Sequence, residues 1–392
     1  MSEPIHLIKT TEDLTTCISQ LGSCDELAID LEFDKNFYRF GFNLCLVQIF
    51  DGNDCYLIDP LSRKIDIEKL FSLLEDRSVQ KVCFSFDEDL RLLHSLGCFP
   101  KNLYDLDTAS RLLNYPALSL SNLLEEVLGV DTGSSSQQSN WYKRPLTEKQ
   151  KQYAANDVLH LLDLKKVLTK QAGSNGVKKW IAEENREYDL LDYSRVSNNF
   201  ILKEKDKKGL NEVEWYIYKK LVYWRHDLAR KFNKPDFQIA GKNVMMNIAK
   251  NPASVSDWQT TRGIFKKAKT ENYEKELKML LDEALGEAKQ QGFSEDEPAN
   301  KPLSDEEYRK MMAEKRKISQ MKKEFFQPIK KRIEESHGSE LASFILSNRI
   351  ITEIITGTNG QLKNYKKELI LGFADELQLD ETVISEFREL AG

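Results

Sequence analysis

The chain has 392 residues, which is long for one ordinary domain and predicts two or three. Hydrophobic residues make up 40% and charged residues 31%, as is typical of a foldable globular protein. The sequence contains no apolar run of about eighteen residues, and its start lacks a basic segment leading into an apolar one. These features argue against a membrane span and a signal peptide, so we expect a cytoplasmic protein.

The formal net charge of −6 is unevenly distributed. Residues 1–170 carry 18 basic and 26 acidic side chains, whereas residues 201–280 carry 18 basic and 10 acidic ones. An acidic segment beside a basic one suits a metal-dependent active site joined to a polyanion-binding domain, although a basic helical surface is more often simply solvated. All cysteines lie between residues 17 and 98 without the spacing of a zinc site, which indicates reduced, mostly buried thiols.

Strand-like and helical stretches alternate along the first part of the chain. Strands are expected at 26–33, 44–50, 54–59, 80–85 and near 103–105. Helices are expected at 11–20, 66–75, 88–96, 108–113, 119–128 and 147–170. This alternation predicts an α/β sheet with helices on both faces. Beyond it the patterns are helical, so we predict domains at 1–175, 205–290 and 304–392, with a polar linker at 291–303.

Two acids interrupt the apolar strand at 26–33. Side chains alternate along a strand, so Asp30 and Glu32 point to the same face. Adjacent carboxylates on a buried strand repel each other and lose hydration, which is costly unless a cation lies between them. Oxygen ligands of this kind select Mg²⁺ or Mn²⁺. The alternative, weighed equally on the pair alone, is an exposed strand end where both acids only aid solubility.

Two further segments favour the metal site. Asp89 lies in the first turn of the helix that follows the strand at 80–85. Tyr153 and Asp157 are four residues apart and share one face of the helix at 147–170.

Neighbouring acids have simpler interpretations. Asp87 and Glu88 point elsewhere on the helix and are expected to be capping or solvent groups. Asp107 is expected to be the N-cap of the helix at 108–113 more than a ligand. Phe33 and Gln48 can shape the cleft, but core packing explains them equally well.

Taken in order, these segments resemble the DEDD superfamily of 3′–5′ exonucleases, tyrosine subclass, and within it the ribonuclease D family. The segments that carry the resemblance are Asp30-Leu31-Glu32-Phe33, Leu46-Val47-Gln48-Ile49-Phe50, Leu57-Ile58-Asp59-Pro60-Leu61, Asp107-Thr108, Trp141, Arg144-Pro145-Leu146-Thr147 and Tyr153-Ala154-Ala155-Asn156-Asp157-Val158. The residues Tyr223-Trp224-Arg225-His226-Asp227-Leu228-Ala229 resemble the first helix of an HRDC domain, and residues 318–391 look like a looser second copy.

The resemblance implies an α/β RNase H-like exonuclease domain followed by two all-α HRDC-like helical domains. It implies a two-metal mechanism in which two divalent cations, Mg²⁺ or Mn²⁺, are held by Asp30, Glu32, Asp89 and Asp157. Tyr153 would orient the attacking water, since a phenol with a pKa near 10 is a poor base at neutral pH.

The expected activity is that of a 3′–5′ exoribonuclease that releases nucleoside 5′-monophosphates from single-stranded RNA 3′ ends, with tRNA precursors as a candidate substrate. Residues expected to bind substrate are Phe33, Gln48, Lys143 and Arg144. The family usually has basic residues where this chain has Ser134 and Gln138, which should weaken phosphate contacts unless Lys143 and Arg144 compensate. The alternatives are a DNA 3′–5′ exonuclease and a non-catalytic nucleic-acid-binding protein.

Overall fold

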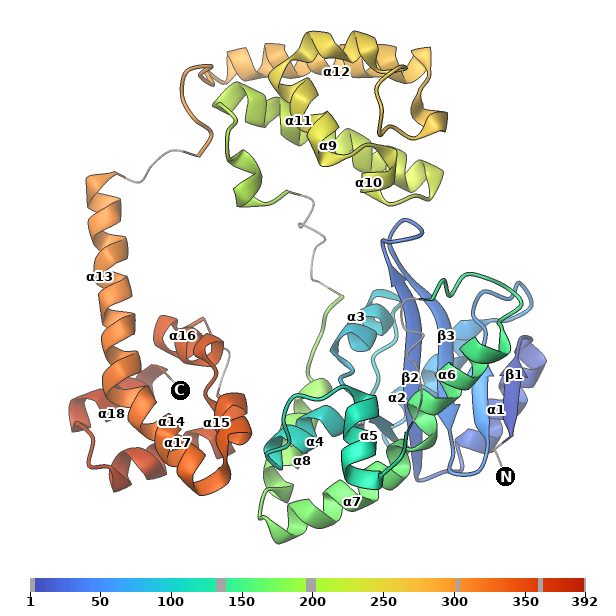
Figure 1. Cartoon of the computed structure of the whole chain (residues 1–392), viewed down its shortest axis with the longest axis vertical. Coiled ribbons are helices and arrows are strands. Elements are labelled where there is room, and N and C mark those ends of the chain that lie inside the picture. The colour runs from blue at the N-terminus through green and yellow to red at the C-terminus, as the bar shows by residue number, and fades with distance from the viewer. Residues whose placement is uncertain (1–3, 132–138, 195–201, 301–303, 359–361, 391–392) are drawn as a thin grey trace. The chain divides into compact units, whose positions relative to one another are not determined.

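The computed structural model describes residues 4–131, 139–194, 202–300, 304–358 and 362–390 (Figure 1). The chain divides into two compact units. The first comprises the described residues of Met1–Glu32, Leu44–Ser194 and Asp305–Gly392, and the second comprises those of Phe33–Asn43 and Arg195–Ser304. Among the described helices, none is both long and apolar enough to cross a membrane.

A mixed sheet forms the centre of the first unit. Its strands are β1 (Ile5–Ile8), β2 (Glu26–Lys35), β3 (Phe42–Phe50), β4 (Cys55–Ile58), β5 (Gln80–Cys83) and β6 (Leu103–Asp105). Their spatial order is β1-β4-β3-β2-β5-β6. β1 is parallel to β4, β3 is antiparallel to β4, and β5 is parallel to both of its neighbours. Gly52, with a φ of +100°, makes the left-handed turn between β3 and β4.

Eight helices of the first unit follow or flank these strands. They are α1 (Thr11–Leu21), α2 (Phe71–Glu75), α3 (Asp87–Ser95), α4 (Leu106–Leu112), α5 (Leu120–Leu128), α6 (Glu148–Leu159), α7 (Leu161–Ser174) and α8 (Lys178–Tyr188). The prediction of one helix over 147–170 is wrong, because the chain breaks at His160 (φ −106°, ψ 0°) into α6 and α7.

One face of the sheet packs against α4 to α7. The core on this face combines strand residues such as Ala28, Leu46 and Val82 with helix residues such as Ala154 and Leu164. Figure 1 shows α6 lying against the sheet, where it packs against β4. Since Ala28 belongs to this core, the alternation of β2 turns its even-numbered positions toward α6.

The last helices complete the first unit. They are α13 (Asp305–Met321), α14 (Gln327–His337), α15 (Ser339–Ile345), α16 (Asn348–Thr356), α17 (Asn364–Glu376) and α18 (Glu381–Leu390). A π-helical turn at Lys322–Phe326 joins α13 to α14 and buries Phe325 and Phe326. These phenylalanines belong to the same continuous core as the sheet domain, and α15 contacts α4.

The second unit is mostly helical, and it also includes the end of β2 and the start of β3 within Phe33–Asn43. It contains α9 (Glu212–Phe232), α10 (Asp236–Ile239), α11 (Lys242–Lys250) and α12 (Glu271–Gln290). Asn211 and Glu214 form a capping box that begins α9, with hydrogen bonds of 2.8 and 2.9 Å. α9 packs against α11 and α12, and the buried rings of Trp224 and Trp258 meet edge to face.

The cysteine prediction is confirmed. All six cysteines are free thiols, and every one except Cys24 is buried.

Candidate metal centre

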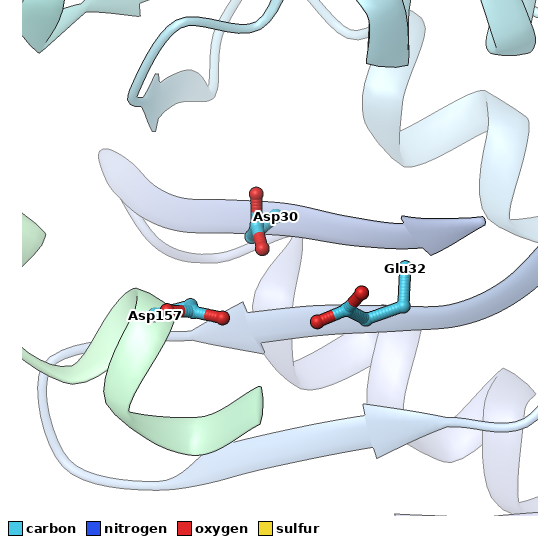
Figure 2. Close-up of side chains that lie close together, drawn as sticks. All are labelled: Asp30, Glu32 and Asp157. Atoms are coloured by element: carbon cyan, nitrogen blue, oxygen red, sulfur yellow. The ribbon is translucent and has the colours of Figure 1, made fainter. Parts of the chain in front are cut away.

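Three carboxylates converge on the α6 face of the sheet. Asp30 and Glu32 come from β2, and Asp157 comes from α6. One ligand oxygen from each lies within 4.8 Å of the other two. Figure 2 shows the three carboxyl groups gathered between the strand and the helix. The structure therefore brings together residues that are more than a hundred positions apart in the chain.

Local sequence explains how α6 packs against the sheet. Thr147 and Gln150 form a capping box that sets the start of the helix. Ala154 and Ala155 are fully buried, and their small side chains let the helix backbone lie near the sheet, where α6 contacts β4. Asp157 then falls in the last turn of α6, and its carboxyl group lies near those of Asp30 and Glu32 (Figure 2).

The fourth predicted ligand, Asp89, borders this cluster. It lies in the first turn of α3, is 7% exposed, and its Oδ1 atom is buried without a hydrogen-bond partner among the described residues. Its charge is the strongest single charge acting on Asp30, so the two carboxylates are neighbours. Its oxygens are not among those that lie within 4.8 Å of one another.

The electrostatics of the cluster are those of crowded, dehydrated acids. Burial raises the pKa of Asp30 and of Glu32 well above the usual range, and the neighbouring carboxylates raise both further. Burial also raises the pKa of Asp89 and of Asp157 to about 7. Four acids that resist ionisation together would be stabilised as carboxylates by a multivalent cation.

This donor set fits a divalent metal. Carboxylate oxygens are the ligands that Mg²⁺ and Mn²⁺ prefer, and the unpaired buried oxygen of Asp89 lacks the hydrogen bond that such a group normally makes. Asp30, Glu32 and Asp157 can share one ion, and Asp89 stands beside Asp30. A divalent cation held there would supply the charge that binds and polarises a phosphate ester or a water molecule.

Tyr153 lies one turn before Asp157 on α6. Its hydroxyl donates a hydrogen bond to the Asp157 carboxylate, which lowers the pKa of that acid against the effect of burial. The tyrosine ring packs near the buried indole of Trp141, with 6.1 Å between the ring centroids. Trp141, which the sequence offered only as part of a motif, thus supports the position of Tyr153.

Gln48 and Phe33 differ in their relation to the cluster. Gln48 is fully buried, and neither its amide nitrogen nor its amide oxygen hydrogen-bonds a described residue. It lies two residues from Leu46, so strand alternation places it on the α6 face of the sheet. Phe33 follows Glu32, so the same alternation turns it to the opposite face, and its half-buried ring packs edge to face on Phe42.

The guanidinium group of Arg144 spends its hydrogen-bond donors on contacts within the fold. Its five N–H donors make five hydrogen bonds: two to the carboxylate of Asp59 and three to the backbone carbonyls of Cys45, Trp141 and Lys143. No donor is left for a substrate phosphate, which argues against the predicted role of Arg144. Lys143 is exposed and makes no ion pair with the described residues, so it retains a free ammonium group.

The contacts of the remaining acids show whether their predicted roles hold. The prediction that Asp107 caps its helix is wrong, because Asp105 is the N-cap of α4 and accepts a hydrogen bond from the Asp107 amide. Asp87 is exposed and Glu88 is half-buried near Arg91, as expected of solvent groups. The predicted effect of Ser134 and Gln138 falls outside the described residues.

Comparison with known proteins gives consistent matches. A family model described as a 3′-5′ exonuclease matches residues 5–172. A ribonuclease D from Desulfotalea psychrophila is 31% identical over 62% of this chain and 66% of its own length, so the chain spans slightly less than two thirds of that relative. A ribonuclease D from Zymomonas mobilis is 30% identical over 66% of this chain and 68% of its own length. The solved structure of Escherichia coli RNase D has a TM-score of 0.68, covers 96% of this chain and 99% of that one, and shares 23% identity, which supports the fold.

The mixed sheet, the carboxylate cluster and the matched residues define a protein with a 3′–5′ exonuclease domain. A helical region follows this domain along the chain. Given the relatives found, the chain belongs to the ribonuclease D family.

Proposed function

We propose that this protein is a metal-dependent 3′–5′ exoribonuclease. The observation that carries the proposal is the cluster of Asp30, Glu32 and Asp157, with Asp89 beside it. These four acids would hold two divalent cations, Mg²⁺ or Mn²⁺. When bound, the cations would lower the pKa of the attacking water and stabilise the charge on the leaving oxygen.

The chain's own groups then divide the work. The carboxylates would hold the cations, which would supply the charge that binds the reacting phosphate, and Tyr153, anchored on Asp157, orients the water. Water attacks the last phosphorus and the bond from phosphorus to the 3′ oxygen breaks. One proton from the water ends on that 3′ oxygen. The released nucleotide keeps its 5′ phosphate, and the shortened strand ends in a 3′ hydroxyl.

We propose further roles for parts of the chain outside the cluster. Gln48 and Lys143 are candidates for substrate contacts, since among the described residues the Gln48 amide has no hydrogen-bond partner and the Lys143 ammonium no ion-pair partner. Residues 205–290 and 304–392 would form HRDC-like domains, and the basic residues of 201–280 would hold RNA by phosphate contacts. Structured RNA with a single-stranded 3′ end, such as a tRNA precursor, is the proposed substrate.

A labelled-strand time course tests the activity. We expect 5′-labelled RNA to shorten step by step and 3′-labelled RNA to release a labelled mononucleotide at once, with Mg²⁺ or Mn²⁺ required. Asp30→Asn should abolish digestion while RNA binding persists. A matched DNA strand should be a poorer substrate, and equal digestion would favour the DNA exonuclease. Digestion unaffected by Asp30→Asn or by removal of metal would refute the proposal.

A further inference from the structure

Asp105 is a buried acid outside the carboxylate cluster, and its hydrogen bonds are unusually many. It is 2% exposed and lies at the end of β6, beside the end of β5. Its Oδ1 atom accepts from the backbone amides of Ser85 and Asp107, both at 2.9 Å. Its Oδ2 atom accepts from the Phe86 amide at 3.3 Å and from the Tyr188 hydroxyl at 2.8 Å. One carboxylate therefore ties together β6, α4, α8 and the turn that precedes α3.

The turn that Asp105 holds is conformationally demanding. Ser85 adopts a left-handed backbone with a φ of +55°, which is uncommon for a residue other than glycine. Phe86 is the N-cap of α3, yet its side chain makes no capping hydrogen bond. The Asp105 carboxylate instead binds the two amides of this turn, so a side chain from another strand supplies the hydrogen bonds there.

This turn determines where Asp89 lies. Asp89 is three residues beyond Phe86 in the first turn of α3, so a rotation of the turn would swing its carboxylate relative to Asp30. The Oδ1 atom of Asp89 is buried and has no hydrogen-bond partner among the described residues, so no such bond fixes this atom in place. Asn185 supports the arrangement from α8 by accepting a hydrogen bond from the Asp105 amide at 2.9 Å.

We propose that Asp105, supported by Tyr188 of α8, is a positioning residue that holds the Ser85–Phe86 turn and thereby sets Asp89 for metal binding. The inference rests on the proposed function only in taking Asp89 as a metal ligand. It assigns a role to α8, a helix that contributes no residue to the carboxylate cluster. Some residues do not contact a metal themselves but hold its ligands in position. Their substitution commonly weakens metal binding by about ten- to a hundredfold.

Mn²⁺ binding to the full-length protein without RNA tests the proposal, with free Mn²⁺ followed by electron paramagnetic resonance. We expect Asp105→Asn to raise the Mn²⁺ dissociation constant about tenfold, since an amide cannot accept all four hydrogen bonds. Tyr188→Phe removes one hydroxyl only and should raise it about threefold. Asp107→Asn is the matched control, because the Asp107 carboxylate does not bind the turn, and its Mn²⁺ affinity should stay unchanged.

The Mn²⁺ dependence of the rate gives a second measurement. A residue that only stabilised the fold would leave this dependence unchanged. In the two variants, the Mn²⁺ concentration for half-maximal rate should rise while the KM for RNA at saturating Mn²⁺ stays constant. Excess Mn²⁺ should restore most of kcat. If Asp105→Asn fails to fold, Tyr188→Phe carries the test alone.

The outcomes separate the two proposals. Wild-type Mn²⁺ affinity in a folded Tyr188→Phe and a folded Asp105→Asn would overturn the positioning role. If the wild-type protein bound no Mn²⁺, or if Asp30→Asn bound it equally well, the metal centre itself would fail. If Asp30→Asn lost Mn²⁺ affinity while Asp105→Asn and Tyr188→Phe kept it, the metal centre would stand and only the role of Asp105 would be refuted.

Discussion

Arg144 clamps the carboxylate of Asp59 with two parallel hydrogen bonds. The Nε atom donates to Oδ2 at 2.7 Å and the Nη2 atom donates to Oδ1 at 2.8 Å. Asp59 is 2% exposed and the Arg144 side chain is partly buried, so this is a largely desolvated ion pair with the bidentate geometry that favours arginine. Arg144 also holds the backbone of the segment that leads into α6, and α6 carries Tyr153 and Asp157.

Removing Arg144 should therefore cost stability. Arg144→Ala leaves the Asp59 carboxylate buried without its partner, and we expect the free energy of unfolding to fall by about 3 kcal/mol. Urea denaturation followed by circular dichroism measures this change. Below the melting transition the KM for RNA should be nearly unchanged, because no Arg144 donor is free for substrate. A large rise in KM with unchanged stability would contradict this expectation.

Lys143→Ala is the neighbouring control with the opposite expectation. The exposed ammonium has no partner among the described residues, so stability should change by less than about 0.5 kcal/mol. If Lys143 contacts a substrate phosphate, the KM should rise and its dependence on salt should weaken. A titration of KM against KCl concentration distinguishes the two neighbours.

Gln48 should show a conflict between stability and activity. Both polar atoms of its amide are buried without partners among the described residues, which is costly in the folded state. Gln48→Leu fills the same space without that cost, and we expect the protein to become about 1 kcal/mol more stable. If the amide serves substrate or its bound water, kcat/KM should fall about tenfold. Higher stability with full activity would show that Gln48 is only a core residue.

The sequence allowed three acids of the carboxylate cluster to be selected because their spacing signals are local. The period of two on β2 puts Asp30 and Glu32 on one face, and a four-residue helical spacing joins Tyr153 to Asp157. Long-range features could not be read in this way. The partnership of Arg144 and Asp59 joins residues 85 positions apart, and nothing near Arg144 indicates that its donors are used.

Local sequence preferences also could not decide between two equally suitable N-cap residues. Asp105 and Asp107 are both good N-cap residues, and only the position of β6 beside β5 selects Asp105. The break at His160 has no glycine or proline to mark it, so the apolar pattern continued through it. Strand β1 has only four residues and a mixed burial pattern, which left no strand signal.

Metal should stabilise the protein more at high pH than at low pH. The pKa of Asp89 and of Asp157 is raised to about 7 by burial, so the metal-free fold takes up protons that the unfolded chain does not. That stabilising contribution is complete below the ordinary carboxyl pKa and is lost as pH rises toward 7. Divalent cations bind the deprotonated acids, so they offset the loss above that pH.

Thermal melting at pH 5.5 and pH 8 measures this dependence, each with EDTA and with Mn²⁺. We expect the melting temperature in EDTA to fall between the two pH values and the increase caused by Mn²⁺ to be larger at pH 8. Asp30→Asn removes one charge from the cluster, so it should raise the metal-free melting temperature at pH 8 and reduce the Mn²⁺ effect. Equal Mn²⁺ effects at both pH values would contradict the assignment of the carboxylates as ligands.

Tyr153→Phe should separate metal binding from turnover. The hydroxyl donates to Asp157 and does not belong to the carboxylate cluster, so the Mn²⁺ dissociation constant should change by less than about threefold. Without that hydroxyl the attacking water loses its proposed orientation, and kcat should fall about a hundredfold. The ring should keep its packing near Trp141, so the melting temperature should stay close to wild type. A variant with full turnover would remove Tyr153 from the mechanism, whereas a variant that lost Mn²⁺ in parallel with turnover would make it a support for Asp157 alone.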